Sequence, residues 1–358
     1  MNKLSQFSLV RLTLLGVLLS IFIFHSSSAS AACLVATNYT GADIGAQVNA
    51  AIAALPSYTD KNLQPWQSGC IEIPYNSTPY TDTSTITINS PFVSLIADPG
   101  TVVYFNGFGD FIRIQQTQSA TGSHTDAPAQ STQIVNLNVT NIKSSTSYSV
   151  GIHAGDMYGI TLRNVSVSGF NNACSGTTPS AAIWFDNKLT FTEGLDLDHV
   201  NTYDNCIGLR FTVDGGTNSF AYGEFRRVVL GLAPLAGTQS SLSEIGVSVE
   251  SGAYLYHQNW ELVTEANTSA AVGMKITPPV SGTGITTFGG NATQKGGDNW
   301  IDWRTECVGC SGPMTFLQMG GANTTFKAVG LISVLDGTAT LNNASGSNYL
   351  FPDTTSTY

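Results

Sequence analysis

Charged and aromatic side chains recur at matched places in successive copies of one short sequence phrase. The position that follows a small and then an apolar residue is occupied, copy after copy, by His153, Trp184, Arg210, Ser248 and Lys275. Two residues beyond Trp184 stands Asp186. If the copies are strands stacked about 4.8 Å apart, Asp186 and Arg210 lie within reach of one bound sugar. Carboxylate, guanidinium and indole groups together suit acid–base chemistry on a carbohydrate.

Asp204 and Asn205 come just before the strand that contains Arg210. We therefore expect one groove, with these catalytic residues: Asp186, Asp204 and Arg210. The substrate-binding residues would be these: His153, Trp184, Asn205 and Lys275. A structural interpretation is equally open, in which His153 is a solvated surface residue, Trp184 packs under a loop and Asp204 caps a turn.

A second charged column competes with the first. Arg163, Asp198, Arg226 and Glu261 alternate in sign from copy to copy, as in a ladder of ion pairs between neighbouring strands. We favour this structural interpretation over catalysis, although Asp196 and Glu224 could form a carboxylate pair.

The phrase that carries these residues predicts a solenoid. In the phrase, the first, third and sixth positions are apolar and the others can be any residue. A small residue that begins an apolar strand follows some positions later. The copies begin at Leu137, Ile160, Leu195, Phe225 and Trp260, and their small residues are Gly151, Ala182, Gly208, Gly246 and Gly273. Self-similarity in fixed order indicates stacked repeats, in which each coil buries its apolar face against its neighbours.

The N-terminal part supplies a cover and the first strands. Asp43 can cap a helix whose apolar face runs from Ile44 to Leu55, and Pro56 would end it. Such a helix would shield the open end of the stack from water. Short strands are expected at residues 71–73, 86–88, 93–96 and 102–105.

Residues 1–31 resemble a secretory signal peptide, with Lys3 and Arg11, an apolar run from Leu12 to Phe24, and a small-residue end. We expect cleavage after Ala31 and a single domain over residues 32–358, with a tail from about residue 342 that is loosely ordered. The product would be secreted, extracellular or periplasmic, a monomer, and without a membrane span. Removing Lys3 and Arg11 leaves 12 basic against 24 acidic residues, so nucleic acid is not an expected partner.

Six cysteines lie in the expected exported part, where disulfides can form. Cys174 and Cys206 occupy the same place in consecutive repeats, so stacking would bring them together. Cys33 and Cys70 flank the expected helix and make a second bridge plausible. Cys307 and Cys310 form a C-x-x-C, for which we expect a local structural disulfide.

Two blocks and a later turn carry a family resemblance. Gly41-Ala-Asp-Ile-Gly-Ala-Gln-Val-Asn-Ala-Ala-Ile-Ala-Ala-Leu55, Gly69-Cys-Ile-Glu-Ile-Pro74 and Asp98-Pro-Gly-Thr101 resemble the N-terminal segment of pectate-lyase-superfamily proteins. The resemblance implies an all-β, right-handed parallel β-helix with an N-terminal capping α-helix and three short strands per coil. It also implies that Asn141 and Asn164 sit in the sharp turn between two strands, where asparagine tolerates a left-handed backbone.

The same resemblance bears on activity. Asp204-Asn-Cys-Ile-Gly-Leu209 is similar to the G-D-D-C segment of polygalacturonases, but Tyr203 replaces the glycine and Asn205 the second aspartate. A lyase would instead use Arg210 as base, with Ca²⁺ held by Asp186 and Asp204 as a possible cofactor. We expect a lyase or hydrolase that acts on an acidic or plant-type polysaccharide. The alternative is a non-catalytic surface or envelope β-helix that binds glycans or mediates contacts.

Overall fold

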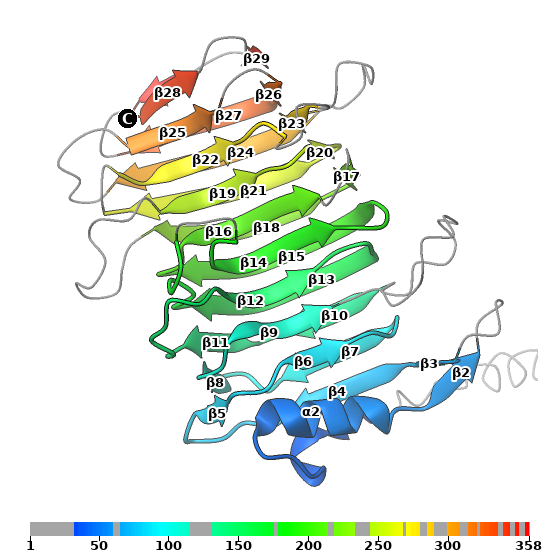
Figure 1. The fold of residues 1–358 in the computed structure, drawn as a ribbon. Coiled ribbons are helices and arrows are strands. Elements are labelled where there is room, and N and C mark those ends of the chain that lie inside the picture. Colours follow the sequence, from blue (N-terminus) through cyan, green and yellow to red (C-terminus); the bar gives the residue numbers. More distant parts are fainter. Residues whose placement is uncertain are drawn as a thin grey trace, which may run out of the picture. The chain divides into compact units, whose positions relative to one another are not determined.

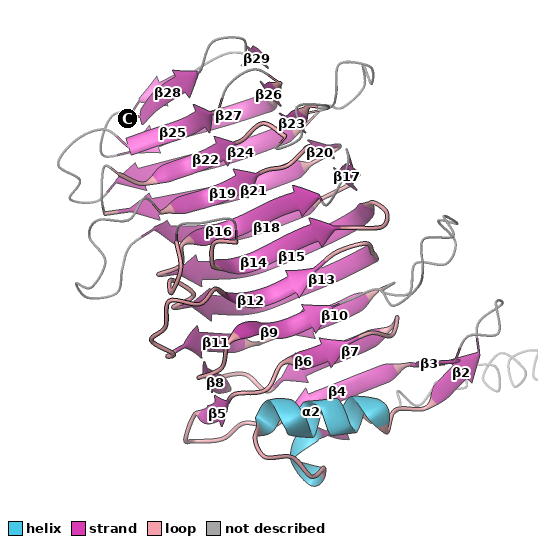
Figure 2. Cartoon of the chain, in the orientation of Figure 1, coloured by secondary structure: helices cyan, strands magenta, loops and turns pink. Residues whose placement is uncertain are grey.

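A computed structural model describes residues 32–59, 65–114, 131–174, 178–213, 218–232, 244–267, 270–279, 285–289, 299–307, 314–320, 323–335, 339–343, 348–350 and 355–357. The chain divides into two units, Met1–Cys33 and Leu34–Tyr358. The expected signal peptide, residues 1–31, lies outside the described residues. The second unit is a right-handed parallel β-helix, as predicted, in which strands of successive coils pair in parallel (Figures 1 and 2).

One sheet of nine strands forms the first wall of the helix. We call it the strand-one sheet; it consists of β6 (Ile86–Ile88), β9 (Gly109–Ile114), β12 (Ser149–Ala154), β14 (Ala181–Asn187), β16 (Ile207–Val213), β19 (Ile245–Val249), β22 (Val272–Ile276), β25 (Met314–Met319) and β28 (Ala339–Asn343).

The other walls belong to a sheet of 19 strands. Its central series is β1 (Leu34–Val35), β4 (Gly69–Ile73), β7 (Val93–Ala97), β10 (Thr132–Val135), β13 (Tyr158–Ser168), β15 (Thr192–Tyr203), β18 (Glu224–Leu232), β21 (Asn259–Ala266), β24 (Trp300–Cys307), β27 (Val329–Leu335) and β30 (Thr355–Thr357). Two flanking series are β5 (Tyr80–Asp82), β8 (Val102–Phe105) and β11 (Asn138–Asn141), and β17 (Asn218–Ala221), β20 (Ala253–Tyr256), β23 (Thr286–Phe288), β26 (Thr324–Lys327) and β29 (Asn348–Leu350). A separate antiparallel hairpin joins β2 (Ser57–Thr59) to β3 (Pro65–Gln67).

The phrase has small residues where the backbone of the next coil comes close. The apolar residues that follow them are in register, Ile152 with Ile183, Leu209, Val247 and Met274. A Cβ at Gly208 would lie 2.8 Å from the carbonyl oxygen of Gly246, and one at Gly246 would lie 2.6 Å from that of Gly273. Backbone of the neighbouring coil therefore fills the space that a side chain would need.

The first copy of the phrase differs from the predicted register, in which Leu137 would lie opposite Ile160. Leu137 does not align with Ile160; instead Thr132 pairs with Ile160 and Ile134 with Leu162. The sharp turn accordingly falls at Asn136, which has a left-handed backbone (φ 57°) and accepts a 3.0 Å hydrogen bond from the Asn164 amide. Asn141 ends β11 instead. The predicted asparagine contact exists, but with Asn136 in place of Asn141.

The competing charged column is a set of ion pairs, as favoured, with altered partners. Arg163 Nε lies 3.8 Å from Asp198, and Arg227 lies 2.7 Å from the same carboxylate. Arg226 binds Asp196 at 2.7 Å instead of Glu261. Asp198 lies opposite Arg226 in the register of β15 and β18, so both arginines reach their partners through the direction of their side chains. A bulge between Phe225 and Val228, where β18 contains one residue more than β21, interrupts the column before Glu261.

A short 3₁₀ turn, η1 (Ala36–Asn38), precedes the predicted helix, which spans Ile44–Ala53 (α2) at the N-terminal end of the stack (Figure 1). Asp43 caps it by accepting a 2.9 Å hydrogen bond from the Ala46 amide. Its apolar face, including Val48 and Ile52, is buried in the core. The four short strands expected after it correspond to β4, β6, β7 and β8.

Candidate active site

The strand-one sheet aligns the predicted column residue for residue. His153 pairs with Trp184, Trp184 with Arg210, Arg210 with Ser248 and Ser248 with Lys275. These side chains are far less open than a groove would make them, because His153 is only 4% exposed and Arg210 only 3%. The column is thus a layer of polar groups nearly sealed from water, and each group needs partners.

Trp184 lies at the centre of this layer. Its ring stacks on His153 with centroids 4.0 Å apart, and the Arg210 guanidinium lies 4.5 Å from the ring centroid on a cation–π contact. The indole nitrogen donates a 2.7 Å hydrogen bond to Thr212 Oγ1. The three predicted neighbours therefore touch one another.

Arg210 does not fit the expected role of a free base. Its Nε and Nη2 donate to the two Glu250 oxygens at 3.1 and 2.9 Å, and Ser248 donates to the same carboxylate at 2.7 Å. A buried guanidinium in such a bidentate pair is held in its charged form and points away from solvent. Its role is to hold Trp184 and Glu250 in place.

Asp186 and His153 form an acid–base pair at the end of the column. His153 Nε2 lies 3.6 Å from Asp186 Oδ2, while Nδ1 lies 3.1 Å from both oxygens of Asp110. Thr212 donates a 2.7 Å hydrogen bond to Asp186. Burial alone would raise the pKa of Asp186, but the adjacent His153 and the hydrogen bond from Thr212 lower it below its ordinary value.

A pocket of about 180 Å³ opens beside this pair. It is lined by Arg113, Ile114, Gly155, Asp156, Asp186, Lys188 and Leu189. Lys188 Nζ lies 3.5 Å from Asp186, and the Arg113 guanidinium contacts both Asp110 and His153. Two carboxylates and two cations thus line a concave surface, and the buried His153 imidazole lies next to one of the carboxylates, Asp186.

Asp156 shapes the loop that supplies Lys188. Its carboxylate accepts the backbone amides of Lys188, Leu189 and Thr190 at 2.8 to 3.2 Å. Burial raises the pKa of Asp156 despite these hydrogen bonds. Its oxygens are committed to the loop, and Asp186, itself only 7% exposed, is the other carboxylate that lines the pocket.

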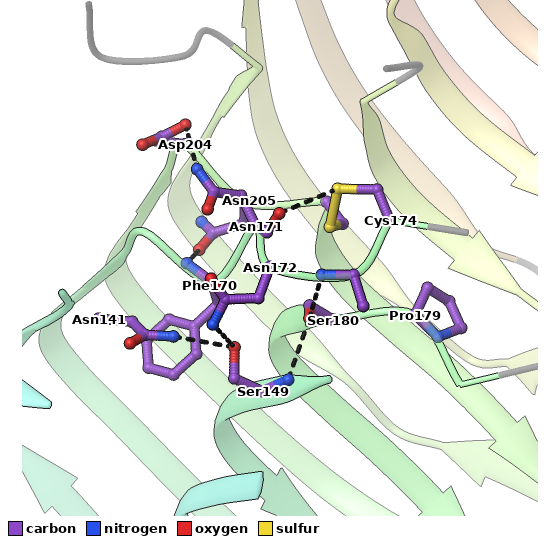
Figure 3. Close-up of a disulfide and its surroundings, with 12 residues drawn as sticks. Asn141, Ser149, Phe170, Asn171, Asn172, Cys174, Pro179, Ser180, Asp204 and Asn205 are labelled. Carbon is purple, nitrogen blue, oxygen red and sulfur yellow. Dashed lines mark hydrogen bonds between the residues drawn. A yellow bond between two sulfur atoms is a disulfide. The ribbon is translucent and has the colours of Figure 1, made fainter. Parts of the chain in front are cut away.

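Asp204 and Asn205 lie elsewhere, in the turn that leads into β16 (Figure 3). Asp186 pairs with Thr212 at the other end of that strand, and the extended run from Ile207 to Thr212 alone spans about 16 Å. Asp204 therefore does not join the catalytic cluster, contrary to the expectation. Asp204 precedes the first residue of β16, whereas Asp186 is near the last residue of β14, so the two carboxylates lie at opposite ends of the parallel strands of this sheet.

Both residues of this turn have structural partners. Asp204, with φ 54°, accepts a 2.8 Å hydrogen bond from Asn171. Asn205 is 3% exposed, accepts the Phe170 amide at 2.9 Å and donates to the Val167 carbonyl at 3.1 Å. Burial, with the nearby charge of Asp204, raises the pKa of Glu244 to about 8.

Lys275 belongs to the column but not to the pocket. Three strand steps separate it from Trp184, about 14 Å at the usual spacing. The predicted contribution of Lys275 at this pocket is therefore not supported by its position.

Sequence reasoning missed Asp110, Arg113 and Lys188. Arg113 pairs with His153 and extends the column by one coil, but its strand has Phe111 where the other copies have glycine or alanine. The alternation Ile112-Arg113-Ile114 is the signal that could have identified it. Lys188 sits in a loop with no periodic signal.

The expected bridge between Cys174 and Cys206 is confirmed, with Cα atoms 4.9 Å apart (Figure 3). Cys33 and Cys70 are both disulfide-bonded as well. The predicted Cys307–Cys310 bridge lies outside the described residues, because Cys310 is not among them.

Within the described ranges, no group of three or more His, Cys, Asp and Glu side chains could hold a metal ion. Asp186 and Asp204 lie at opposite ends of the strands of the strand-one sheet. They are therefore too far apart to bind one Ca²⁺ ion together, as the sequence had suggested. No helix in the described part of the chain is long and apolar enough to cross a membrane.

No protein-family model matches the sequence, and no curated protein matches it. Among solved structures, a protein of Geobacillus virus E2 is similar at 12% identity and a TM-score of 0.34, over 89% of this chain and 61% of that one. The Dettilon tailspike protein is similar at 13% identity and a TM-score of 0.37, over 88% of this chain and 68% of that one. DFA-IIIase from Arthrobacter chlorophenolicus A6 is similar at 9% identity and a TM-score of 0.31, over 86% of each chain. This chain spans about three fifths of the length of the Geobacillus virus protein, and these likenesses concern the fold alone.

Proposed function

We propose that the protein is a secreted carbohydrate-active enzyme that cleaves an acidic polysaccharide in the pocket beside Asp186. One observation carries the proposal: the Asp186 carboxylate lies 3.6 Å from the His153 imidazole and lines a concave site together with Arg113 and Lys188. Arginine and lysine are suited to bind the carboxylate of a uronic acid. The disulfide-bonded cysteines support a location outside the reducing cytosol.

A lyase is better supported than a hydrolase. In an elimination, a base removes the proton next to the uronate carboxylate, the C–O bond to the leaving sugar breaks, and the departing oxygen gains a proton. Asp186 and His153 supply a base and an acid within one site. A hydrolase needs two available carboxylates across the scissile bond, whereas Asp156, the other carboxylate of this pocket, is committed to three backbone amides.

The second candidate is a non-catalytic glycan-binding β-helix. The observation in its favour is that Arg210 and His153 are almost fully buried and paired, as expected of a structural polar layer.

The test is a panel of acidic polysaccharides assayed for absorbance of unsaturated sugars and for new reducing ends. We expect Asp186→Asn and His153→Gln each to lower kcat about 100-fold or more, and the matched Asp204→Asn to leave it unchanged. Full activity in Asp186→Asn would overturn the site. Reducing ends without unsaturated product would indicate hydrolysis, and no cleavage of any polymer would favour the binding protein.

A further inference from the structure

A strip of exposed aromatic side chains starts at the edge of the pocket and continues along the stack. We call it the aromatic strip; it consists of Tyr158, Phe191, Tyr222, Tyr254, Tyr256 and His257. Tyr222 is 55% exposed, and the other members are exposed or half-buried. Contiguous apolar surface of this kind is a feature of binding sites in proteins.

The rings contact one another in two groups, Tyr158 with Phe191 and the other four members together. Tyr222 stacks on His257 at 5.2 Å, Tyr254 stacks on Tyr256 at 5.8 Å, and Tyr256 lies 5.1 Å from His257. Tyr158 meets Phe191 edge to face at 5.5 Å. These contacts fix the rings before any ligand arrives, so little side-chain entropy is lost on binding.

Strand pairing makes the strip follow the helix axis. Tyr158 pairs with Glu193, Glu193 with Ala221 and Ala221 with Tyr256, one position in each of four successive coils. β17 and β20 lie at the same edge of the stack (Figure 1). Coils follow one another at about 4.8 Å, which is similar to the length of one sugar in an extended polysaccharide.

The strip is continuous with the pocket. Asp156 and Leu189 line the pocket, and each stands two residues before a member of the strip, Tyr158 and Phe191 respectively. Leu189 is 46% exposed and belongs to the same loop as Phe191. A chain bound in the pocket would therefore reach the strip without a break.

Charge separates the two surfaces. The pocket contains Arg113 and Lys188, whereas the strip contains no lysine or arginine. Burial, together with the neighbouring Glu193, raises the pKa of Tyr158. Aromatic faces without cations suit the apolar faces of uncharged sugars and would not attract a polymer with a charge on every unit.

We propose that the aromatic strip binds uncharged sugar units of the polysaccharide whose acidic unit enters the pocket. The natural ligand is then a heteropolysaccharide that combines uronic acid with neutral sugars. This inference rests on the proposed function for the acidic unit, but the strip itself is tested without catalysis.

The experiment is affinity electrophoresis of the full chain in native gels that contain polygalacturonate, hyaluronan or a neutral mixed-linkage β-glucan. We expect retardation by the neutral glucan and by hyaluronan, with dissociation constants about 5-fold weaker in Tyr222→Ala and in Tyr256→Ala. Tyr75→Ala removes a tyrosine that is 58% exposed outside the strip and serves as the matched control, which should bind as the wild type does.

Asp186→Asn separates this inference from the proposed function. It should bind the neutral glucan as tightly as the wild type does, because this polymer brings no acidic unit to the pocket, even where cleavage is abolished or was never present. Equal retardation of the strip variants and the wild type would overturn the strip, as would retardation by polygalacturonate alone or by none of the three polymers. An unchanged urea midpoint in the tyrosine variants shows that any loss of binding is local.

Discussion

At the scale of single residues, the outward side of the strand-one sheet behaves as a second core made of polar groups. Arg210, Glu250 and Ser248 satisfy one another, and Trp184 is held between Arg210 and His153. In such a layer, removing one partner of an ion pair lowers the free energy of unfolding by more than the intact pair contributed to it, because the remaining charge stays buried without a partner.

Glu250→Ala tests this directly. Its loss leaves the Arg210 guanidinium buried and unpaired, so we expect a fall of about 3 kcal/mol in the free energy of unfolding. Arg210→Met combined with Glu250→Ala should recover most of it, since no charge then remains. The measurement is urea unfolding of the single and double variants, with the exposed Glu224→Ala as control. A double variant less stable than Glu250→Ala would contradict the argument.

At this scale the sequence predicts which side chains stand next to each other better than what they do. Periodicity alone placed His153, Trp184 and Arg210 in contact. It could not show that Glu250 would neutralise Arg210, because a bidentate pair depends on rotamers rather than on spacing. Nor could it exclude Asp204, since proximity in sequence to strand one does not say at which edge of the sheet a residue lies.

At the scale of elements, the turns decide register. The first copy was misread because Leu137 and Val139 imitate the start of the phrase, while the true start, Thr132 and Ile134, has a polar residue at the first place. The ion pairs differ because of side-chain direction: Asp198 lies opposite Arg226 as predicted, yet Arg226 extends to Asp196 and Arg227 to Asp198. The bulge in β18 faces β21, where one extra residue interrupts the column before Glu261, and composition does not reveal it.

The cap of α2 gives a pH prediction. Asp82 is fully buried, accepts the Gly45 amide at 3.1 Å and lies beside Asp43, and burial together with the Asp43 carboxylate raises its pKa to about 7. The folded state then binds this proton more tightly than the unfolded chain does. Stability from Asp82 is complete below about pH 4 and is lost as the pH rises toward 7.

Asp82→Asn should remove that loss. We expect the variant to gain stability relative to the wild type between pH 4 and pH 7, on the order of 3 kcal/mol in total. Thermal unfolding across this range measures it, with the exposed Asp302→Asn on β24 as the matched control. A constant difference between Asp82→Asn and wild type at all pH values would show that Asp82 does not hold a proton in the fold.

At the scale of the whole molecule, each coil contacts mainly its neighbours, so a covalent link between two adjacent coils stabilises the stack at that point. The Cys174–Cys206 disulfide joins the segments before two consecutive strand-one strands, 32 residues apart in the chain. In a stack of this kind, stability is close to a sum over coils and their interfaces.

Replacing both cysteines by serine should destabilise the stack by about 3 to 4 kcal/mol, the value for a loop of this length. The readout is the urea midpoint of the double variant, which leaves Cys33 and Cys70 intact where a reductant would not. A midpoint equal to that of the wild type would mean that strand pairing alone fixes these two coils.

The packing of Trp184 has an optical consequence. A ring that is fixed by tertiary packing contributes to near-ultraviolet circular dichroism, and the signal disappears when that packing becomes fluid. Trp184 is fixed against His153, with ring centroids 4.0 Å apart, and against the Arg210 guanidinium, 4.5 Å from the ring centroid. Replacing Trp184 with phenylalanine and subtracting the two spectra therefore isolates the signal of this polar layer from that of the other four tryptophans.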